Sequence, residues 1–466
     1  MSTAGGRWPV QLGPLSQLSP SALSNQRYNF VVLTLDGLFF WLGISYYSAT
    51  TILPLFVSHL TPSNLVVGAV PAVVALSWSL PQLFGARALR NLAGRSAGGG
   101  SSSLGGSNGQ VQVARPDARK RYIIQTALLG RVPMLVLVAV TALYSVSHPT
   151  LTLVLFLLCF GLFRLAGGLN TPVYYDLVAV VIHPRIRARF IGLSQFLGCA
   201  IAAVALATGS AVLDSFPFPG GFVILFTVGL VLMTGAIGFM AIVREPNFTQ
   251  ETERAPDVSG DPAGAAGITD TGTGIVRAAA LTLRRDAAFR GYLGGRVFVA
   301  LASMAQAFYA IHATRDMGGS DGDVAFFSAI LLGSQTVSTL VWGAVADRLH
   351  LQPVLLAATM LGSLATGLAL AAPSLAWFGL VFALSGAALG ALAVTDPGMP
   401  LALAERSNED RALYVAVANT VLAPVYVVAP LVGGAAADTG GYALTYVAAL
   451  AAGALACMLV ARMRAG

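Results

Sequence analysis

Four ionisable side chains of this chain lie inside long apolar runs, where a charge is expensive. An ionisable group within a lipid bilayer is by default a functional candidate. Two of the four, an acid in the first run and an arginine in the fourth, occur at comparable depth, so one hypothesis is an ion pair linked to substrate or protons. The other is a purely structural pair, or arginines that extend to the membrane surface. The four residues are Asp36, Arg131, Arg164 and Arg296.

Hydroxyl and amide side chains also occur near the middle of the apolar runs. Such groups suit hydrogen bonding to a small polar or amphipathic solute. Each one could instead form a hydrogen bond between helices. We expect two or three of the set to contact a solute. The candidates are Tyr46, Tyr47, Gln195, Gln306, Tyr309 and Asn419.

The residue types and their spacing do not favour ATP hydrolysis, metal binding or catalysis. The phosphate-binding loop of ATPases needs Gly-Lys-Ser/Thr, and the only lysine is Lys120, between two arginines. The five histidines have no metal-ligand spacing, and the three cysteines lie inside apolar runs. We therefore expect no catalytic residue, no metal site and no cofactor.

The elements that carry these side chains follow from the composition. Of 466 residues, 56% are hydrophobic and 10% are charged, with a mean hydropathy of +0.75. Soluble domains carry about a quarter charged residues, so this chain needs lipid as its solvent. A spanning helix takes about 20 mostly apolar residues, which predicts an all-α polytopic membrane protein with twelve spans. The runs are 30–57, 65–86, 122–144, 150–171, 190–213, 221–243, 291–313, 323–344, 352–372, 375–395, 412–436 and 441–461.

The basic residues predict the orientation. With both termini in the cytoplasm, 23 of the 27 Lys and Arg residues lie on the cytoplasmic side, three lie within runs, and only Arg315 lies outside. This asymmetry is typical of multi-pass proteins of the cytoplasmic membrane. The net charge of +7 comes from short arginine clusters between apolar runs, so it indicates membrane anchoring and no nucleic-acid partner.

The division into domains follows from two polar interruptions. We expect a cytoplasmic tail over 1–28, a first six-helix half over 29–243, a central cytoplasmic loop over 244–290 and a second six-helix half over 291–462. The first half contains an insertion at 96–114, whose residues 96–109 include six Gly and five Ser. Such a composition is typical of a flexible linker.

The two halves resemble each other at matching points. The fourth run ends in Asn170-Thr171-Pro172 and the tenth in Thr395-Asp396-Pro397. On the same register Gln195 matches Asn419. Two six-helix repeats in the same orientation are related by an axis along the membrane normal.

The segment Gly343-Ala-Val-Ala-Asp347-Arg348 lies between the eighth and ninth runs. It is similar to the motif G-x-x-x-D-R of the major facilitator superfamily, which the family carries in both halves. The resemblance implies two pseudo-symmetric six-helix halves, and a gating role for Gly343, Asp347 and Arg348 that locks the cytoplasmic side when the cavity faces outward. The first-half copy has Leu89 in place of the aspartate, so the lock is expected to depend on the second copy.

These features together predict a secondary active transporter, a monomer in the lipid bilayer that moves a small solute by alternating access. Protons or another ion are the expected coupling partner. One alternative is a membrane sensor of the same fold that does not transport. The other is a membrane-embedded enzyme, which would need a cluster of carboxylates or histidines at the membrane surface.

Overall fold

A computed structural model describes residues 20–79, 118–182, 184–245, 282–283, 285–407 and 411–463. Several expected features lie outside the described residues. They are residues 1–19 of the cytoplasmic tail, the insertion at 96–114, the loop with Leu89, and residues 246–281 of the central loop.

Every element of regular structure in the described ranges is a helix, as the apolar runs predict. The first half contains α1 (Pro20–Ser45), α2 (Ile52–Leu60), α3 (Asn64–Ser79), α5 (Ala118–Tyr144), α6 (Pro149–Val181), α7 (Pro184–Ser215) and α8 (Gly220–Ala241). The second half contains α10 (Ala287–Ala302), the 3₁₀ turn η4 (Ser303–Ala305), α11 (Gln306–Arg315), α12 (Asp321–Leu349), α13 (Leu351–Ala371), α14 (Ala376–Ser407) and α15 (Arg411–Arg462).

Each of the twelve expected runs contains helical residues, and residues 80–86 of the second run lie outside the described part of the chain. In the described chain, ten helices are long and apolar enough to cross a membrane, and α3 is a shorter apolar helix. The long helix α15 holds two runs, because its backbone leaves helical geometry at Gly440 and Gly441. Gly441 has φ +71°, a conformation that glycine adopts without strain. The division between α13 and α14, where two runs nearly touch, is present.

The first and seventh runs are not continuous helices, which is where the structure differs from the expected elements. The run 30–57 breaks at residues 46–51 between α1 and α2, and the run 291–313 passes through η4 between α10 and α11. At the first break, Ser45 donates to the carbonyl of Leu42 and Thr51 donates to Ser48, both at 2.7 Å. Ser and Thr side chains that bond nearby polar groups compete with the helical ladder, so a hydroxyl-rich segment ends the helix.

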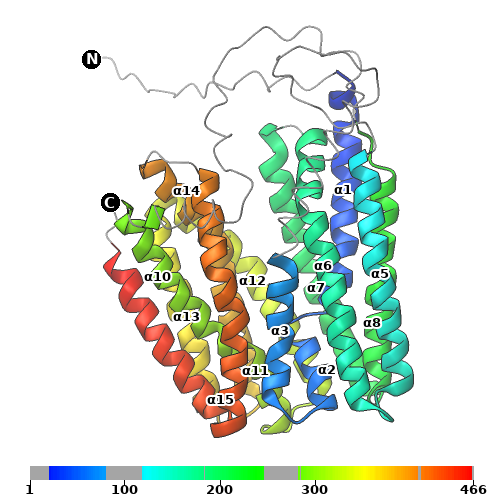
Figure 1. The fold of residues 1–466 in the computed structure, drawn as a ribbon, viewed down its shortest axis with the longest axis vertical. Helices are drawn as coiled ribbons and strands as arrows, with labels where there is room; N and C mark the ends of the chain where they lie inside the picture. Colours follow the sequence, from blue (N-terminus) through cyan, green and yellow to red (C-terminus); the bar gives the residue numbers. More distant parts are fainter. Residues whose placement is uncertain are drawn as a thin grey trace, which may run out of the picture.

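The two halves lie side by side and meet along two helix pairs (Figure 1). Helix α3 packs against α15, and α7 packs against α12. The first contact is close, because a Cβ atom at Gly434 would lie 2.5 Å from the carbonyl oxygen of Asn64. Small residues of this kind let membrane helices approach closely.

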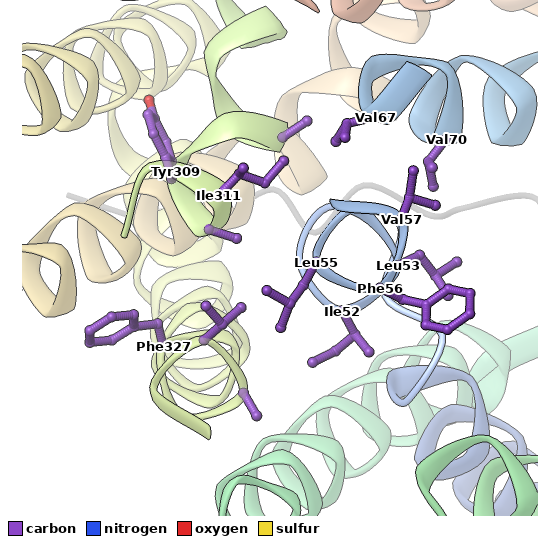
Figure 2. Close-up of a cluster of buried hydrophobic side chains, with 14 of the residues drawn as sticks. Ile52, Leu53, Leu55, Phe56, Val57, Val67, Val70, Tyr309, Ile311 and Phe327 are labelled. Carbon is purple, nitrogen blue, oxygen red and sulfur yellow. The ribbon is translucent and has the colours of Figure 1, made fainter. Parts of the chain in front are cut away.

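Helix α2 fills the space between the halves at one end of the bundle. Its residues Ile52, Leu53, Leu55, Phe56 and Val57 are all fully buried. In Figure 2, Leu55 points from α2 toward the side of Ile311 and Phe327, whereas Phe56 points to the opposite side. We call this end, which carries residues 46–64, 214–220, 315–321 and 438–441, the closed end.

Candidate substrate site

A cavity of about 570 Å³ lies within the first half, surrounded by α1, α5, α6, α7 and α8. Its volume is in the range of small-molecule sites, about 300–1,000 Å³. Most of the wall is apolar or aromatic, and a smaller set of side chains is polar. The polar and charged members are Asp36, Thr126, Arg131, Arg164, Asn170, Thr171, Ser194 and Gln195.

Helix periodicity explains why these side chains converge. On α6, the lining residues Arg164, Gly167, Asn170, Tyr174 and Val178 follow one another at intervals of three or four. Residues at that spacing share one face of an α-helix. A single face of α6 therefore presents the charge, the amide and the aromatic ring to the cavity.

Arg131 is held in place by the helices around it. Its Nη2 donates to the carbonyl of Met233 on α8 at 3.0 Å, and its guanidinium carbon lies 5.5 Å from the centre of the Phe163 ring. Arg131 and Asp36 line the same cavity. Asp36, which is 8% exposed, lines the same cavity as Arg164, and the pairing of these two residues stays a prediction.

Polar atoms in the cavity wall are left without a hydrogen-bond partner. Arg131 Nε, Asn170 Oδ1 and Ser194 Oγ are buried and make no hydrogen bond in the described chain. All three residues line the cavity. A buried polar group left unsatisfied costs about 1–3 kcal/mol, so a polar occupant would stabilise this site.

The second half contains a buried arginine in a different setting. The side chain of Arg296 is 1% exposed, and its Nη2 lies 2.7 Å from Asp396 Oδ1. The same nitrogen donates to the hydroxyl of Tyr426 at 2.8 Å. From the sequence, Arg296 was predicted as an intramembrane charge, whereas Asp396 was used only to align the two halves. Asp396 could have been singled out from the sequence, because it is a charged residue directly after Thr395 in the segment that aligns the halves.

The predicted solute-binding residues are distributed unevenly. Of the six, the described lining of the cavity includes Gln195, whose Nε2 lies 3.4 Å from Cys199 Sγ. The three tyrosines are buried, and their hydroxyls bond protein groups. Tyr46 bonds the carbonyl of Ala205 at 3.5 Å, Tyr47 that of Phe226 at 2.5 Å, and Tyr309 the hydroxyl of Thr366 at 2.8 Å. Gln306 is half-buried at the start of α11, and Asn419 is exposed on α15. Contact of these residues with a solute stays a prediction.

Sequence reasoning did not single out Asn170 or Ser194 as site residues. Asn170 could have been predicted, because it lies six residues after Arg164 and lines the same cavity. It is also adjacent to Thr171, which belongs to the segment used to align the two halves. Ser194 is adjacent to the predicted Gln195, and both line the cavity. A helical projection of the runs around each intramembrane charge would have found them.

Two aspartates join the halves at the closed end, each at the first turn of a helix from the other half. Asp438 on α15 accepts hydrogen bonds from the backbone N–H groups of Asn64 and Leu65 on α3, at 2.6 and 3.0 Å, and from the hydroxyl of Ser63 at 2.9 Å. Asp214 on α7 accepts one from the N–H of Gly322 on α12, at 3.1 Å. Helix N-termini favour negative groups because of their free N–H groups and dipole.

Two further contacts close the same end. Arg315 donates to the carbonyls of Ser58, Thr61 and Pro62 at 2.9–3.1 Å. His59 Nε2 lies 2.9 Å from Asp321 Oδ2. Every one of these bonds is polar and crosses between the halves.

The expected gating motif lies at the opposite end of α12 from these contacts. Gly343 is half-buried, and Asp347 and Arg348 are exposed. In the described part of the chain, neither Asp347 nor Arg348 forms a hydrogen bond or an ion pair. The lock that the resemblance implies is therefore not made in this conformation, in which the other end is closed.

Known proteins match this chain through structure alone. No family model matches it, and no curated protein matches its sequence. Among solved structures, the nucleoside transporter NupG (D323A mutant) is 13% identical with a TM-score of 0.60, over 94% of this chain and 99% of that one. A bacterial homologue of the iron transporter ferroportin in an inward-facing state gives the same values. A D-xylose–proton symporter is 15% identical with a TM-score of 0.60, over 94% and 98%.

These likenesses cover nearly the whole of each chain. The protein is an all-helical, multi-pass membrane protein that shares its fold with these solved transporters.

Proposed function

We propose that this protein is a secondary active transporter that moves a small solute across the cytoplasmic membrane by alternating access. The observation that carries the proposal is the cavity inside the first half, whose wall holds unpaired buried polar atoms. A site that only filled space would be expected to satisfy those atoms within the protein. The solved transporters of the same fold support the assignment to transport rather than catalysis.

The contacts between the halves supply the second part of the proposal. In the present conformation the closed end is joined by hydrogen bonds from Asp438, Asp214 and Arg315, while Asp347 is unengaged. In the cycle we propose, the closed end separates and Asp347 engages at the other end. Two rigid halves rocking about a site near the membrane midplane perform this exchange in transporters built from repeats.

Both termini lie in the cytoplasm in this proposal, and the closed end faces outward. Cysteine introduced at Asp316, an exposed residue at the closed end, should react with a membrane-impermeant maleimide in intact cells. Cysteine introduced at Leu349, an exposed residue at the far end of α12, should react only with a permeant reagent. The reverse pattern would invert the orientation.

Flux in proteoliposomes is the direct test. Purified protein would be reconstituted and screened by counterflow with a panel of labelled solutes, including a nucleoside, a pentose, a dipeptide and aromatic carboxylates. Saturable counterflow of at least one solute is expected. A protein that binds a solute in the cavity but never exchanges it would be a sensor of the same fold.

A reversible cross-link at the closed end tests alternating access. Ser63 Oγ and Asp438 Oδ2 lie 2.9 Å apart on opposite halves, so Ser63→Cys with Asp438→Cys places two thiols within reach of a short bifunctional thiol reagent. Cross-linking should stop counterflow. The single variant Ser63→Cys, treated in the same way, should keep its flux. Undiminished flux in the cross-linked pair would contradict the proposed cycle.

A further inference from the structure

One contact at the closed end contains a side chain that can change its charge near neutral pH. His59 Nε2 lies 3.0 Å from Asp321 Oδ1 and 2.9 Å from Asp321 Oδ2. His59 belongs to α2 in the first half, whereas Asp321 is the first residue of α12 in the second half. Histidine is the side chain that ordinarily gains or loses its proton between pH 5 and 8. The hydrogen bonds that Asp438, Asp214 and Arg315 make between the halves at this end involve no histidine.

The two partners lie at helix ends that favour opposite charges. His59 is in the last turn of α2, and Asp321 is in the first turn of α12. The C-terminal end of a helix stabilises a positive charge, and the N-terminal end stabilises a negative one. Both helix ends therefore stabilise an ion pair at this position.

Two phenylalanines of the first half hold the imidazole ring in place. His59 stacks on Phe218, with the ring centres 4.7 Å apart and the planes at 18°. Phe222 approaches the same ring at 5.7 Å and 67°. The face of an aromatic ring attracts a cation. The side chains of His59 and Asp321 remain 33% and 21% exposed, so the ring can exchange protons with the water at this end.

Other acidic and basic groups surround His59. Helices α3, α6, α11 and α12 pack against α2. Of these, α3 carries no charged residue, and the first charged residue of α6 is Arg164, near the middle of that helix. In the described chain, Asp321 is the group within ion-pair distance of His59. The other acidic and basic residues that these helices, their caps and α7 bring to this side of the bundle are His148, Asp214, His312, Arg315, Asp316 and Asp323.

We propose that His59 and Asp321 form a pH-sensitive latch between the halves, which holds the closed end when His59 is protonated and weakens when His59 is neutral. The inference rests on the proposed function, because it names a regulation of the same closure. A protonated imidazole always donates from Nε2 and adds its charge, whereas a neutral imidazole donates there in only one of its two tautomers. Acidity on the side of the closed end therefore favours closure, and a rise in pH through the titration of the histidine favours opening.

The test uses purified protein, so it does not depend on the orientation in a membrane. In the reporter protein, Leu55, which is fully buried on α2, is replaced by cysteine, and the native Cys159, Cys199 and Cys457 are replaced by alanine. The rate at which a maleimide labels this cysteine at pH 5.5 and at pH 8 measures opening of the closed end. The matched control is the reporter protein with His59→Gln, because glutamine keeps a side-chain N–H donor but does not titrate.

The ratio of the two labelling rates at each pH removes the titration of the reporter cysteine and of the other histidines, which both proteins share. The rate of the reporter protein divided by that of His59→Gln should fall by about threefold from pH 8 to pH 5.5, a size typical of a partly exposed ion pair. A ratio that is constant, or that rises on acidification, would overturn the proposal.

Two further variants keep the test decisive if His59→Gln does not fold. Asp321→Asn keeps the shape of the side chain and removes its charge, so the reporter rate divided by the Asp321→Asn rate should show the same fall of about threefold on acidification. His59→Lys carries a charge at both pH values, so its rate divided by that of Asp321→Asn should be low at both. A ratio against Asp321→Asn that does not change with pH in the protein with His59 would also reject the latch.

The outcome for the latch is separable from the outcome for transport. Solute counterflow, together with labelling that does not depend on His59, would keep the transporter and reject the latch. Labelling that follows the protonation of His59, without counterflow of any solute, would keep the latch and reject transport.

Discussion

The two halves of this protein share a fold but treat their buried arginines differently. In the second half Arg296 is neutralised within the protein by Asp396 and bonded by Tyr426. In the first half Arg131 is fixed by a carbonyl and a ring and lines a cavity. Unsatisfied nitrogens do not distinguish the two arginines, because Arg131 Nε and Arg296 Nε and Nη1 all make no hydrogen bond in the described chain. One half therefore gives its buried arginine a carboxylate partner, whereas the other places its arginine in the wall of a cavity.

Removing the internal counter-ion should have the largest effect, because it leaves the buried guanidinium of Arg296 without its carboxylate partner. Asp396→Asn leaves the charge of Arg296 buried at 1% exposure. Breaking one side of a buried pair costs about 3–5 kcal/mol, and we expect the low end because the Asp396 side chain is 43% exposed. The measurement is the unfolding midpoint of the purified protein.

The matched control is the double variant Asp396→Asn with Arg296→Gln. Removing both partners of a buried pair is often nearly neutral, so this variant should recover most of the lost stability. A double variant as unstable as Asp396→Asn would show that the pair is not the source of the effect.

The two halves can also be compared at the closed end, where each contributes an aspartate, and here we expect smaller losses of stability. Asp438 accepts three hydrogen bonds at α3. Losing such a cap costs up to about 2 kcal/mol, which is about a 30-fold change in an equilibrium constant. Asp438→Ala should therefore favour opening of this end. A reporter cysteine at Leu55, which is fully buried on α2, should react up to about 30-fold faster with an impermeant maleimide.

The equivalent change in the other half should be weaker. Asp214 makes one hydrogen bond at α12, to Gly322 at 3.1 Å. A single bond of this kind contributes about 1 kcal/mol, so Asp214→Ala should raise the labelling of the same reporter by only about fivefold. Equal effects of Asp214→Ala and Asp438→Ala would mean that the two contacts contribute alike to closure.

The smallest effect on this conformation is expected at the gating motif, where the halves differ in sequence as well. Asp347 stands where the first half has Leu89, and it is exposed and makes no hydrogen bond in the described chain. Asp347→Asn should leave the free energy of unfolding within about 0.5 kcal/mol of the wild type. If the motif locks the opposite state, the same variant should slow counterflow while labelling of the Leu55 reporter from outside falls.

Much of the fold was predictable, because the requirement for about 20 apolar residues per span is local. The twelve runs were located, including the pair separated only by Pro373 and Ser374. The interruptions of the first and seventh runs were not predicted. Residues 46–51 are rich in hydroxyl groups, but such groups occur in continuous membrane helices as well. The end of α1 depends on hydrogen bonds such as that of Ser45 to Leu42, which hydropathy does not report.

The candidate site was predicted in part. Asp36, Arg131, Arg164 and Gln195 all line the cavity, because each interrupts an apolar run and is visible as such. Asn170 and Ser194 were missed, since an amide or a hydroxyl in a span is common and becomes informative only when the face it shares with an arginine is known.

The amino-acid sequence by itself determined the membrane class, the all-helical fold and the approximate positions of the helices. These properties depend on composition and on spacing along the chain. The tertiary structure alone decided that Asp36 and Arg131 line one cavity, that Arg296 binds Asp396, and that Asp438 caps a helix 374 residues away. The physical reason is that such contacts depend on how each helix is rotated and packed against the others, and the short-range energies that form a helix do not determine its rotation.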